Sequence, residues 1–342
     1  MTNSVTGGQA YDNNLLQTMK SIPKVDADYS LLENPDNVPT MWIAPLKYVW
    51  EGLKRKDADI IIFNSAMYMR FLPLLFLLSK VFRKNTMVVH HHFMYREFTG
   101  FKRWLYKKCE WRFLRLASML IIPSPYVYAE ITKQIPEAKV LLWKIPFEQS
   151  RKFYPSPIKG NLTFTGTIEH RKGLHFLIES LRVLKSKGVE YNLKIIGKTV
   201  DNTYRERLET IISEHSLNVE FTGFISKEEK EKLLSETDIF VFPSLLEGFG
   251  MVLVEAQVYA LPIISFDNSA MPFSVFNNIN GFTVPTGDYK AFAEAIITLM
   301  ENRQLRDNFG KAAFENSKRQ NTQQNLIKEV ASYLEPLIQN SR

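Results

Sequence analysis

Short apolar segments of buried-strand length recur along the chain, and they limit the folds that it can adopt. In the first half they are residues 58–64, 85–91 and 117–124. In the second half they are residues 161–166, 191–197, 219–224, 238–244 and 262–267. Helical segments lie between them, and strands that read as continuous apolar runs separated by helices indicate βαβ units around a parallel sheet. The sequence therefore predicts an α/β protein with two similar halves.

The length of 342 residues also suggests about two domains. Residues 144–160 contain three prolines and mixed charge, which is typical of a linker. We predict an N-terminal domain at residues 1–152 and a C-terminal domain at residues 153–321. A last helix at about 322–342 could pack back on the N-terminal domain.

Composition narrows the classes of function. The net charge is +7, from 43 Lys and Arg against 36 Asp and Glu, and it favours phosphate-bearing or membrane-surface partners. Cys109 is the single cysteine, so no internal disulfide forms and a reducing compartment is indicated. The N-terminus lacks the pattern of a secretory signal, and the most apolar run, residues 71–78, is too short to span a bilayer. A cytoplasmic protein is expected.

Residues 243–262, PSLLEGFGMVLVEAQVYALP, place two glutamates eight residues apart around the start of an apolar helix. A helix that begins near Gly250 after a glycine-containing loop can bind phosphate oxygens at its N-terminus. Glu255 lies more than a turn inside this helix, where a carboxylate is costly unless donors satisfy it. A ribose diol supplies two donors, and Glu247 could accept from sugar hydroxyls beyond the phosphates. The residues expected beside the pyrophosphate are Phe249, Gly250, Met251 and Val252.

The same spacing would also arise from an exposed helix glutamate and an ordinary loop glutamate. Further motifs favour the functional interpretation. The stretch resembles the E-x7-E signature of the family-four retaining glycosyltransferases, and the likeness extends through residues 260–267 and 279–288. Residues 162–184, LTFTGTIEHRKGLHFLIESLRVL, resemble the strand, glycine and Lys-Gly of that family, and residues 6–16 resemble its N-terminal glycine-rich loop.

This resemblance implies a GT-B fold, in which two Rossmann-like domains with parallel sheets face each other across a cleft. It also implies transfer of a hexose from a UDP-, GDP- or ADP-sugar with retention of configuration and without a metal ion or other cofactor. In the usual picture for this class, a phosphate oxygen of the donor takes the proton of the acceptor. The acceptor is expected to be a glycan or a lipid-linked sugar of surface polysaccharide or glycoconjugate synthesis.

The resemblance also assigns phosphate contacts. Lys172, on a loop before a helix, would reach the pyrophosphate as a point charge. The family commonly has an arginine after the strand-ending Gly166, where this chain has Thr167, and Arg171 could replace it. Gly7 and Gly8 would face the phosphates. The alternative of a nucleotide-sugar-binding subunit without catalysis is left open by Thr167 and by the short segment before Gly7.

His90, His91 and His92 end a predicted strand, and ligands of open α/β sheets bind at strand carboxyl ends. The family carries a histidine there that faces the transferred sugar. Alternation places His91 on the opposite face from its two neighbours. A metal site at these histidines is disfavoured because adjacent strand residues diverge. The Asp-Ala-Asp triplets at residues 26–28 and 57–59 are interpreted as turns, so no metal ligand is predicted.

Residues 98–116, FTGFKRWLYKKCEWRFLRL, combine basic and aromatic side chains. As a helix, this segment could lie on an anionic membrane surface, and residues 69–84 could add to that face. An ordinary domain helix with a charged edge is an equal alternative. Nucleic acid is not expected as a partner because the net charge is modest and no reader motif occurs.

Overall fold

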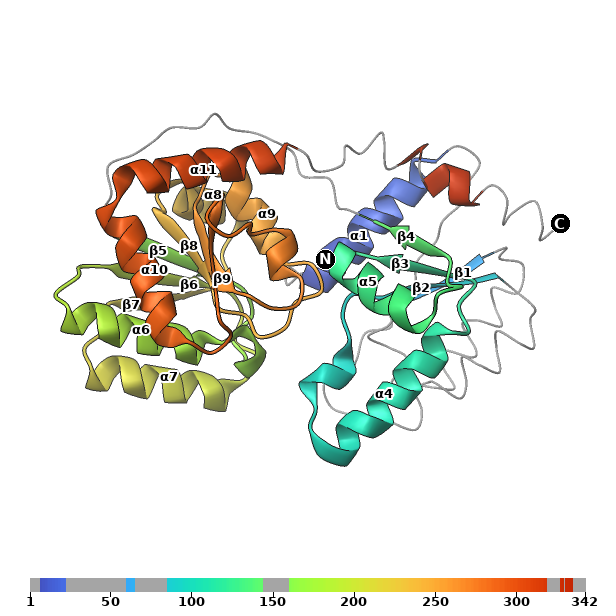
Figure 1. Cartoon of the computed structure of the whole chain (residues 1–342), viewed down its shortest axis with the longest axis horizontal. Coiled ribbons are helices and arrows are strands. Elements are labelled where there is room, and N and C mark those ends of the chain that lie inside the picture. Colours follow the sequence, from blue (N-terminus) through green and yellow to red (C-terminus); the bar gives the residue numbers. More distant parts are fainter. Residues whose placement is uncertain are drawn as a thin grey trace. The chain divides into compact units, whose positions relative to one another are not determined.

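The computed structural model describes residues 7–22, 60–64, 85–143, 160–318, 327–328 and 330–334 (Figure 1). The chain divides into two compact units, Gly8–Pro146 with Asn321–Arg342, and Phe147–Gln320 with Met1–Gly7. The change at residue 147 falls in residues 144–159, which lie outside the described ranges. The boundary at 152 and 153 therefore stays a prediction.

The first unit contains a parallel sheet with the strand order β1-β2-β3-β4. Its strands are β1 (Ile60–Asn64), β2 (Asn85–Val89), β3 (Met119–Ile122) and β4 (Val140–Leu142). Its helices are α1 (Gly7–Lys20), η2 (Met94–Glu97), α4 (Gly100–Leu114) and α5 (Pro125–Gln134). Ser124 fixes the start of α5, because its hydroxyl accepts the Val127 N–H and Pro125 occupies the first helical turn.

The second unit contains a six-stranded parallel sheet with the order β10-β9-β8-β5-β6-β7. Its strands are β5 (Asn161–Thr165), β6 (Asn192–Ile196), β7 (Val219–Gly223), β8 (Ile239–Phe242), β9 (Ile263–Phe266) and β10 (Gly281–Val284). Its α-helices are α6 (Leu174–Ser186), α7 (Asn202–Glu214), α8 (Lys227–Ser235), α9 (Met251–Val258), α10 (Tyr289–Glu301) and α11 (Arg303–Ser317). Two short 3-10 turns, η3 (His170–Lys172) and η4 (Met271–Phe273), lie in its loops. The predicted α/β class with parallel sheets in two units is confirmed.

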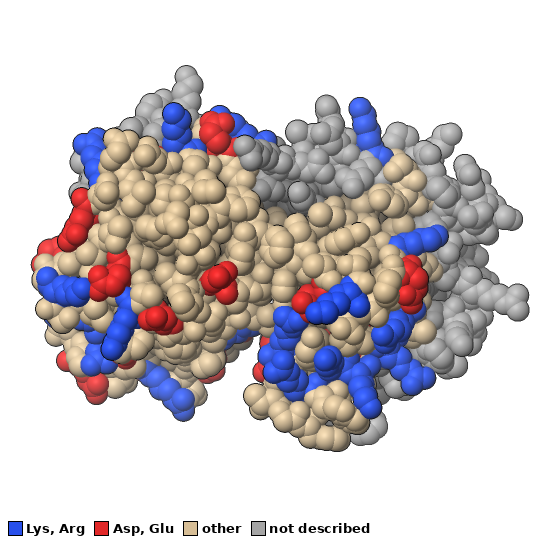
Figure 2. Space-filling view, in the orientation of Figure 1, with Lys and Arg blue, Asp and Glu red and all other residues tan. Residues whose placement is uncertain are grey.

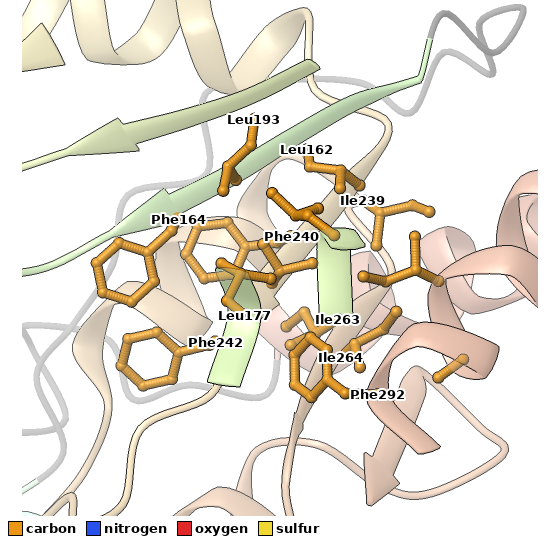
Figure 3. Close-up of a cluster of buried hydrophobic side chains, with 14 of the residues drawn as sticks. Leu162, Phe164, Leu177, Leu193, Ile239, Phe240, Phe242, Ile263, Ile264 and Phe292 are labelled. Atoms are coloured by element: carbon orange, nitrogen blue, oxygen red, sulfur yellow. The ribbon is translucent and has the colours of Figure 1, made fainter. Parts of the chain in front are cut away.

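The core of the second unit explains why its strands read as continuous apolar runs. Helices lie on both faces of the sheet, with α6 against α10 and α9 against α11 (Figure 1). Strand side chains are therefore buried in both directions, and Phe164, Phe240 and Phe242 are at most 1% exposed. Figure 3 shows them packed with Leu177 of α6 and Phe292 of α10.

Several sequence features singled out above lie outside the described residues. These are residues 1–6, the two Asp-Ala-Asp triplets, the apolar run at 71–78 within 69–84, and residues 144–159.

In the C-terminal segment, Val330 and Leu334 are buried, and Ser332 and Tyr333 line a surface hollow with residues of β3, α5 and β4. Among the helices of the described ranges, none has the length and apolar character that a bilayer span requires.

Candidate active site

Two loops of the second unit meet at the carboxyl edge of its sheet. One follows β5 and contains η3, and the other follows β8 and leads into α9. They approach closely because β5 and β8 are paired neighbours. The Leu245 N–H donates to the Arg171 carbonyl at 2.8 Å. Gly173 adopts a left-handed φ of 68°, and a Cβ there would lie 2.0 Å from the Pro243 carbonyl oxygen. This position thus requires glycine for its conformation and for the close approach.

The contact of the two loops brings Lys172 and Glu247 together. The Lys172 ammonium donates to the Glu247 carboxylate at 2.5 Å, and the Ser244 hydroxyl donates to the same oxygen at 2.9 Å. The Arg171 guanidinium lies 3.6 Å from that oxygen and donates to the Leu246 carbonyl at 2.8 Å. Two cations therefore converge on one carboxylate, whose side chain is only 11% exposed.

Burial and charge act in opposition on this pair. Burial disfavours the ionised carboxylate of Glu247, but Lys172 and Arg171 together hold its pKa below the ordinary value. Burial lowers the pKa of Lys172, although the Glu247 carboxylate favours its charged form. The arrangement is a partly desolvated ion pair, in which each charge is stabilised mainly by its partner.

Thr167, which occupies the position where the family commonly has an arginine, contacts a nearby carboxylate. The Thr167 hydroxyl donates to the Glu169 carboxylate at 2.7 Å, and the Arg171 guanidinium donates to the same oxygen at 2.8 Å. Thr167 thus helps to hold the carboxylate that orients Arg171. At Gly166, which directly follows β5, an added Cβ would lie 3.7 Å from the Lys172 side chain.

Glu255 occupies a different setting from the one that the apolar helix predicted. Its side chain is 28% exposed and forms an ion pair with Lys230 of α8. Lys230 thus supplies the donor that a carboxylate in this apolar helix was expected to require. The reason is that the helix turns this position toward α8, while Leu253, Val254 and Ala256 face the core.

The segment between the two glutamates begins α9 as predicted. Gly250 is the residue before the helix and has a left-handed φ of 77°. Phe249, Met251 and Val252 are partly exposed, so this end of the helix is open to a ligand. Gly7 and Gly8, which were expected in a glycine-rich loop, form the first turn of α1.

The three histidines after β2 have three different environments. His90 is fully buried, its Nε2 lies 3.8 Å from the Glu110 carboxylate, and burial lowers its pKa well below the ordinary value. His91 bonds Asp12 of α1 through Nε2 at 3.0 Å. His92 bonds Glu97 through Nε2 at 3.0 Å on the surface. His91 thus contacts α1, His90 lies near Glu110 of α4, and His92 bonds Glu97 of η2; because β2 ends at Val89, the three histidines follow the strand instead of ending it.

The structure groups the predicted residues by unit. Arg171, Lys172 and Glu247 come together at one sheet edge, and the histidines lie in the other unit. Sequence reasoning missed Ser244, Lys230 and Asp12. The charge-rich segment SKEEKEKLL gives no signal for Lys230, whereas Ser244 directly follows a strand and precedes the glutamate motif. In the part of the chain that is described, no group of three or more His, Cys, Asp or Glu side chains could hold a metal ion.

Two α/β units, each built on a parallel sheet, define the GT-B class. Solved structures with this fold superpose on most of the chain. Sucrose-phosphate synthase from Thermosynechococcus elongatus has a TM-score of 0.81 over 99% of this chain and 96% of its own, at 18% identity. HepE from Anabaena, in complex with UDP and glucose, has a TM-score of 0.72 over 88% of this chain and 84% of its own, at 18% identity.

The family follows from the sequence matches. The family described as "Glycosyl transferases group 1" matches residues 147–316, and the family described as "Glycosyltransferase Family 4" matches residues 17–144. The chain belongs to the family-four glycosyltransferases.

Curated relatives share part of the sequence. The capsular polysaccharide biosynthesis glycosyltransferase CapM of Staphylococcus aureus is 32% identical over 43% of this chain and 38% of its own length. The D-rhamnosyltransferase WbpZ of Pseudomonas aeruginosa is 25% identical over 78% of this chain and 71% of its own length. The chain spans about half or less of the length of several relatives that it matches most strongly, CapM among them.

Proposed function

We propose that the chain is a retaining, metal-independent glycosyltransferase that moves a hexose from a nucleotide-diphosphate sugar to a glycan or lipid-linked acceptor. The observation that carries the proposal is the convergence of Lys172 and Arg171 on Glu247 at the carboxyl edge of the second sheet. Two cations beside an open helix N-terminus suit a pyrophosphate, and a partly buried carboxylate suits sugar hydroxyls.

The ion pair gives a physical account of donor binding. Phosphate oxygens compete with Glu247 for Lys172 and Arg171, so these cations turn toward the pyrophosphate as the donor enters. Glu247 is then released to accept hydrogen bonds from the hexose, while Ser244 still donates to it. In the transition state the leaving phosphate gains charge, and positioned cations and helix amides stabilise it.

The nucleoside would lie at Glu255. Its carboxylate is partly exposed, so it can accept from both ribose hydroxyls beside its ion pair with Lys230. Carbohydrate hydroxyls are donors, and bonds to a charged acceptor are stronger than neutral ones. In this proposal the ribose would lie at α9, the pyrophosphate at the first turn of α9 and the hexose toward Glu247.

His91 is the histidine that we assign to the transferred sugar. His90 is fully buried and His92 is held by Glu97, whereas His91 is partly exposed and bonded to Asp12. A carboxylate that accepts from one ring nitrogen fixes the orientation of an imidazole. Asp12 therefore acts as a positioning residue for His91.

Relatives support a role in surface polysaccharide synthesis. CapM and WbpZ are named for capsular polysaccharide biosynthesis and rhamnosyl transfer, and the solved HepE complex holds UDP and glucose. By analogy, the donor here would be a UDP-, GDP- or ADP-sugar, and the product would be a growing polysaccharide or glycoconjugate.

Calorimetric titration with UDP, GDP, ADP and their sugars tests the proposal. One nucleotide series should bind, and Lys172→Gln should weaken both the diphosphate and its sugar by roughly tenfold or more, as loss of a charge-assisted bond implies. Lys187→Gln is the matched control for removal of a lysine paired with a glutamate, because Lys187 pairs with Glu294 on the surface of the same unit, and it should leave both affinities unchanged. Equal loss in both variants would contradict the proposed phosphate site.

A further inference from the structure

The first two turns of α4 stand in solvent and carry large apolar side chains. Phe101 is 74% exposed, Trp104 is 50% exposed and Leu105 is 42% exposed. The rings of Phe101 and Trp104 stack with their centroids 5.4 Å apart. Such a cluster is unfavourable in water, so its presence on a surface indicates contact with another apolar body.

The second half of α4 anchors the helix to its unit. Trp111, Phe113 and Leu114 are buried there. The fully buried Glu110 carboxylate accepts the N–H groups of Met94 and Tyr95 in the preceding turn. The exposed half is therefore a projection held on a rigid base.

Positive charge surrounds this projection. Four exposed cations lie on the same turns, namely Lys102, Arg103, Lys107 and Lys108. The Lys108 ammonium lies 4.1 Å from the Trp104 ring centroid, and no acidic residue occurs between residues 98 and 109. Figure 2 shows Lys and Arg side chains gathered on the part of the first unit that carries α4, beside a tip without charged side chains.

We propose that the N-terminal half of α4 docks on an anionic lipid bilayer. The aromatic pair and Leu105 would enter the headgroup region, where aromatic rings are favoured, and the cations would contact lipid phosphates. Lysines and arginines retain their charge while their aliphatic stems cover the apolar residues. The occupant is a membrane because an aliphatic side chain beside stacked rings suits acyl chains, whereas a nucleic acid would leave Leu105 without a partner.

The inference does not depend on the proposed sugar transfer, because its test measures binding alone. The full chain is sedimented with vesicles of phosphatidylglycerol and phosphatidylcholine, and with phosphatidylcholine alone. Binding should require the anionic lipid and should fall as salt is raised. Each cation removed near an anionic surface should weaken binding about fivefold, so replacing Lys102, Arg103, Lys107 and Lys108 with Gln should abolish it.

A matched variant removes the same number of charges elsewhere. Lys187, Lys227, Arg303 and Lys318 lie exposed in the second unit, and their replacement with Gln should leave sedimentation nearly unchanged. Equal losses in the two quadruple variants would overturn the proposal, since binding would then follow net charge. So would a wild-type chain that ignores anionic vesicles at low salt, or one that binds only RNA.

A site-specific label keeps the test independent of variant folding. With Cys109, the sole cysteine, replaced by Ser, a polarity-sensitive fluorophore is attached through Phe101→Cys or, as a control, through Val200→Cys, which is 61% exposed in the second unit. On anionic vesicles the label at 101 should shift to shorter wavelength, and the label at 200 should not. A label at 101 that remains in water while the protein sediments would refute α4 as the docking surface.

Discussion

At the scale of single residues, two glutamates from one motif have different surroundings and should have different functions. Glu247 is nearly buried between two cations, whereas Glu255 is partly exposed and paired with Lys230. We propose that the first carboxylate orients the side chains that would bind phosphate, and that the second accepts hydrogen bonds from the nucleoside.

We expect Glu255→Gln to weaken binding of the nucleoside diphosphate and of its sugar alike. Loss of a hydrogen bond to a charged group corresponds to roughly 1.5–3 kcal/mol. Glu247→Ala should instead preserve or strengthen binding of the free diphosphate, because it removes the carboxylate that competes with phosphate for Lys172. The same variant should weaken binding of the sugar-bearing donor. Calorimetry that finds equal losses of diphosphate affinity in both variants would contradict this division.

The pair of His91 and Asp12 leads to a second prediction. Asp12→Asn should lower kcat for sugar transfer, because it misorients the imidazole of His91. The KM for the nucleotide-sugar should be nearly unchanged, because no contact with the nucleotide is removed. The matched control is Glu97→Gln, which removes the negative charge from the equivalent 3.0 Å bond of His92 on the surface. The assignment fails if steady-state kinetics show the same decrease in kcat for both variants.

At the scale of elements, the turn before α6 sets the approach of the Lys172 loop to the Glu247 loop. Gly173→Ala should destabilise the protein more than Gly188→Ala. Both glycines have a left-handed φ, which costs another residue roughly 1–2 kcal/mol. Only Gly173 would also place a Cβ against the Pro243 carbonyl, since Gly188 has open space. Thermal unfolding that ranks the two variants equally would exclude this steric requirement.

The N-terminus of α6 also predicts a dependence of stability on pH. The Tyr204 hydroxyl accepts the His175 N–H at 2.9 Å and lies 2.8 Å from its Nδ1. Burial, and to a lesser degree His170, lower the pKa of His175 from 6.5 to about 4. The imidazole of His175 binds a proton less readily in the folded state than in the unfolded state. The free energy of unfolding should therefore fall as the pH drops from 6.5 to about 4. His175→Gln should show a smaller decrease in melting temperature over the same range, and an identical decrease would contradict the account.

Sequence patterns predicted most elements but missed two strands, β4 and β10. β4 has only three residues and one buried position, and the two middle residues of β10 are only partly buried. The β10 segment, GFTV, lacks a continuous apolar run, whereas β4 lies in the short run VLLW that adjoins the predicted linker. At the site, the helix start near Gly250 followed from local sequence, whereas the role proposed for Lys172 came from the family resemblance. The partner of Glu255 did not follow from local sequence, because Lys230 reaches it from a different helix.

At the scale of the whole molecule, we propose that the second unit recognises the donor, and the histidines lie in the first unit. Resemblance identified both halves, since motifs of the family span nearly the whole chain. Contacts such as that of Lys172 with Glu247 required coordinates, because 75 residues separate them in sequence. The same holds for His91 and Asp12, which are 79 residues apart.

The most direct test of the central claim is turnover of a nucleotide-sugar by the purified chain in EDTA, followed by proton NMR of the anomeric signals. We expect one donor among the UDP-, GDP- and ADP-sugars to release its nucleoside diphosphate. The first-formed sugar or glycoside should keep the configuration of the donor, and Glu247→Gln should abolish the reaction. Three results would contradict this expectation. They are a product of inverted configuration, a requirement for added Mg²⁺ or Mn²⁺, and binding without release of nucleotide from any donor.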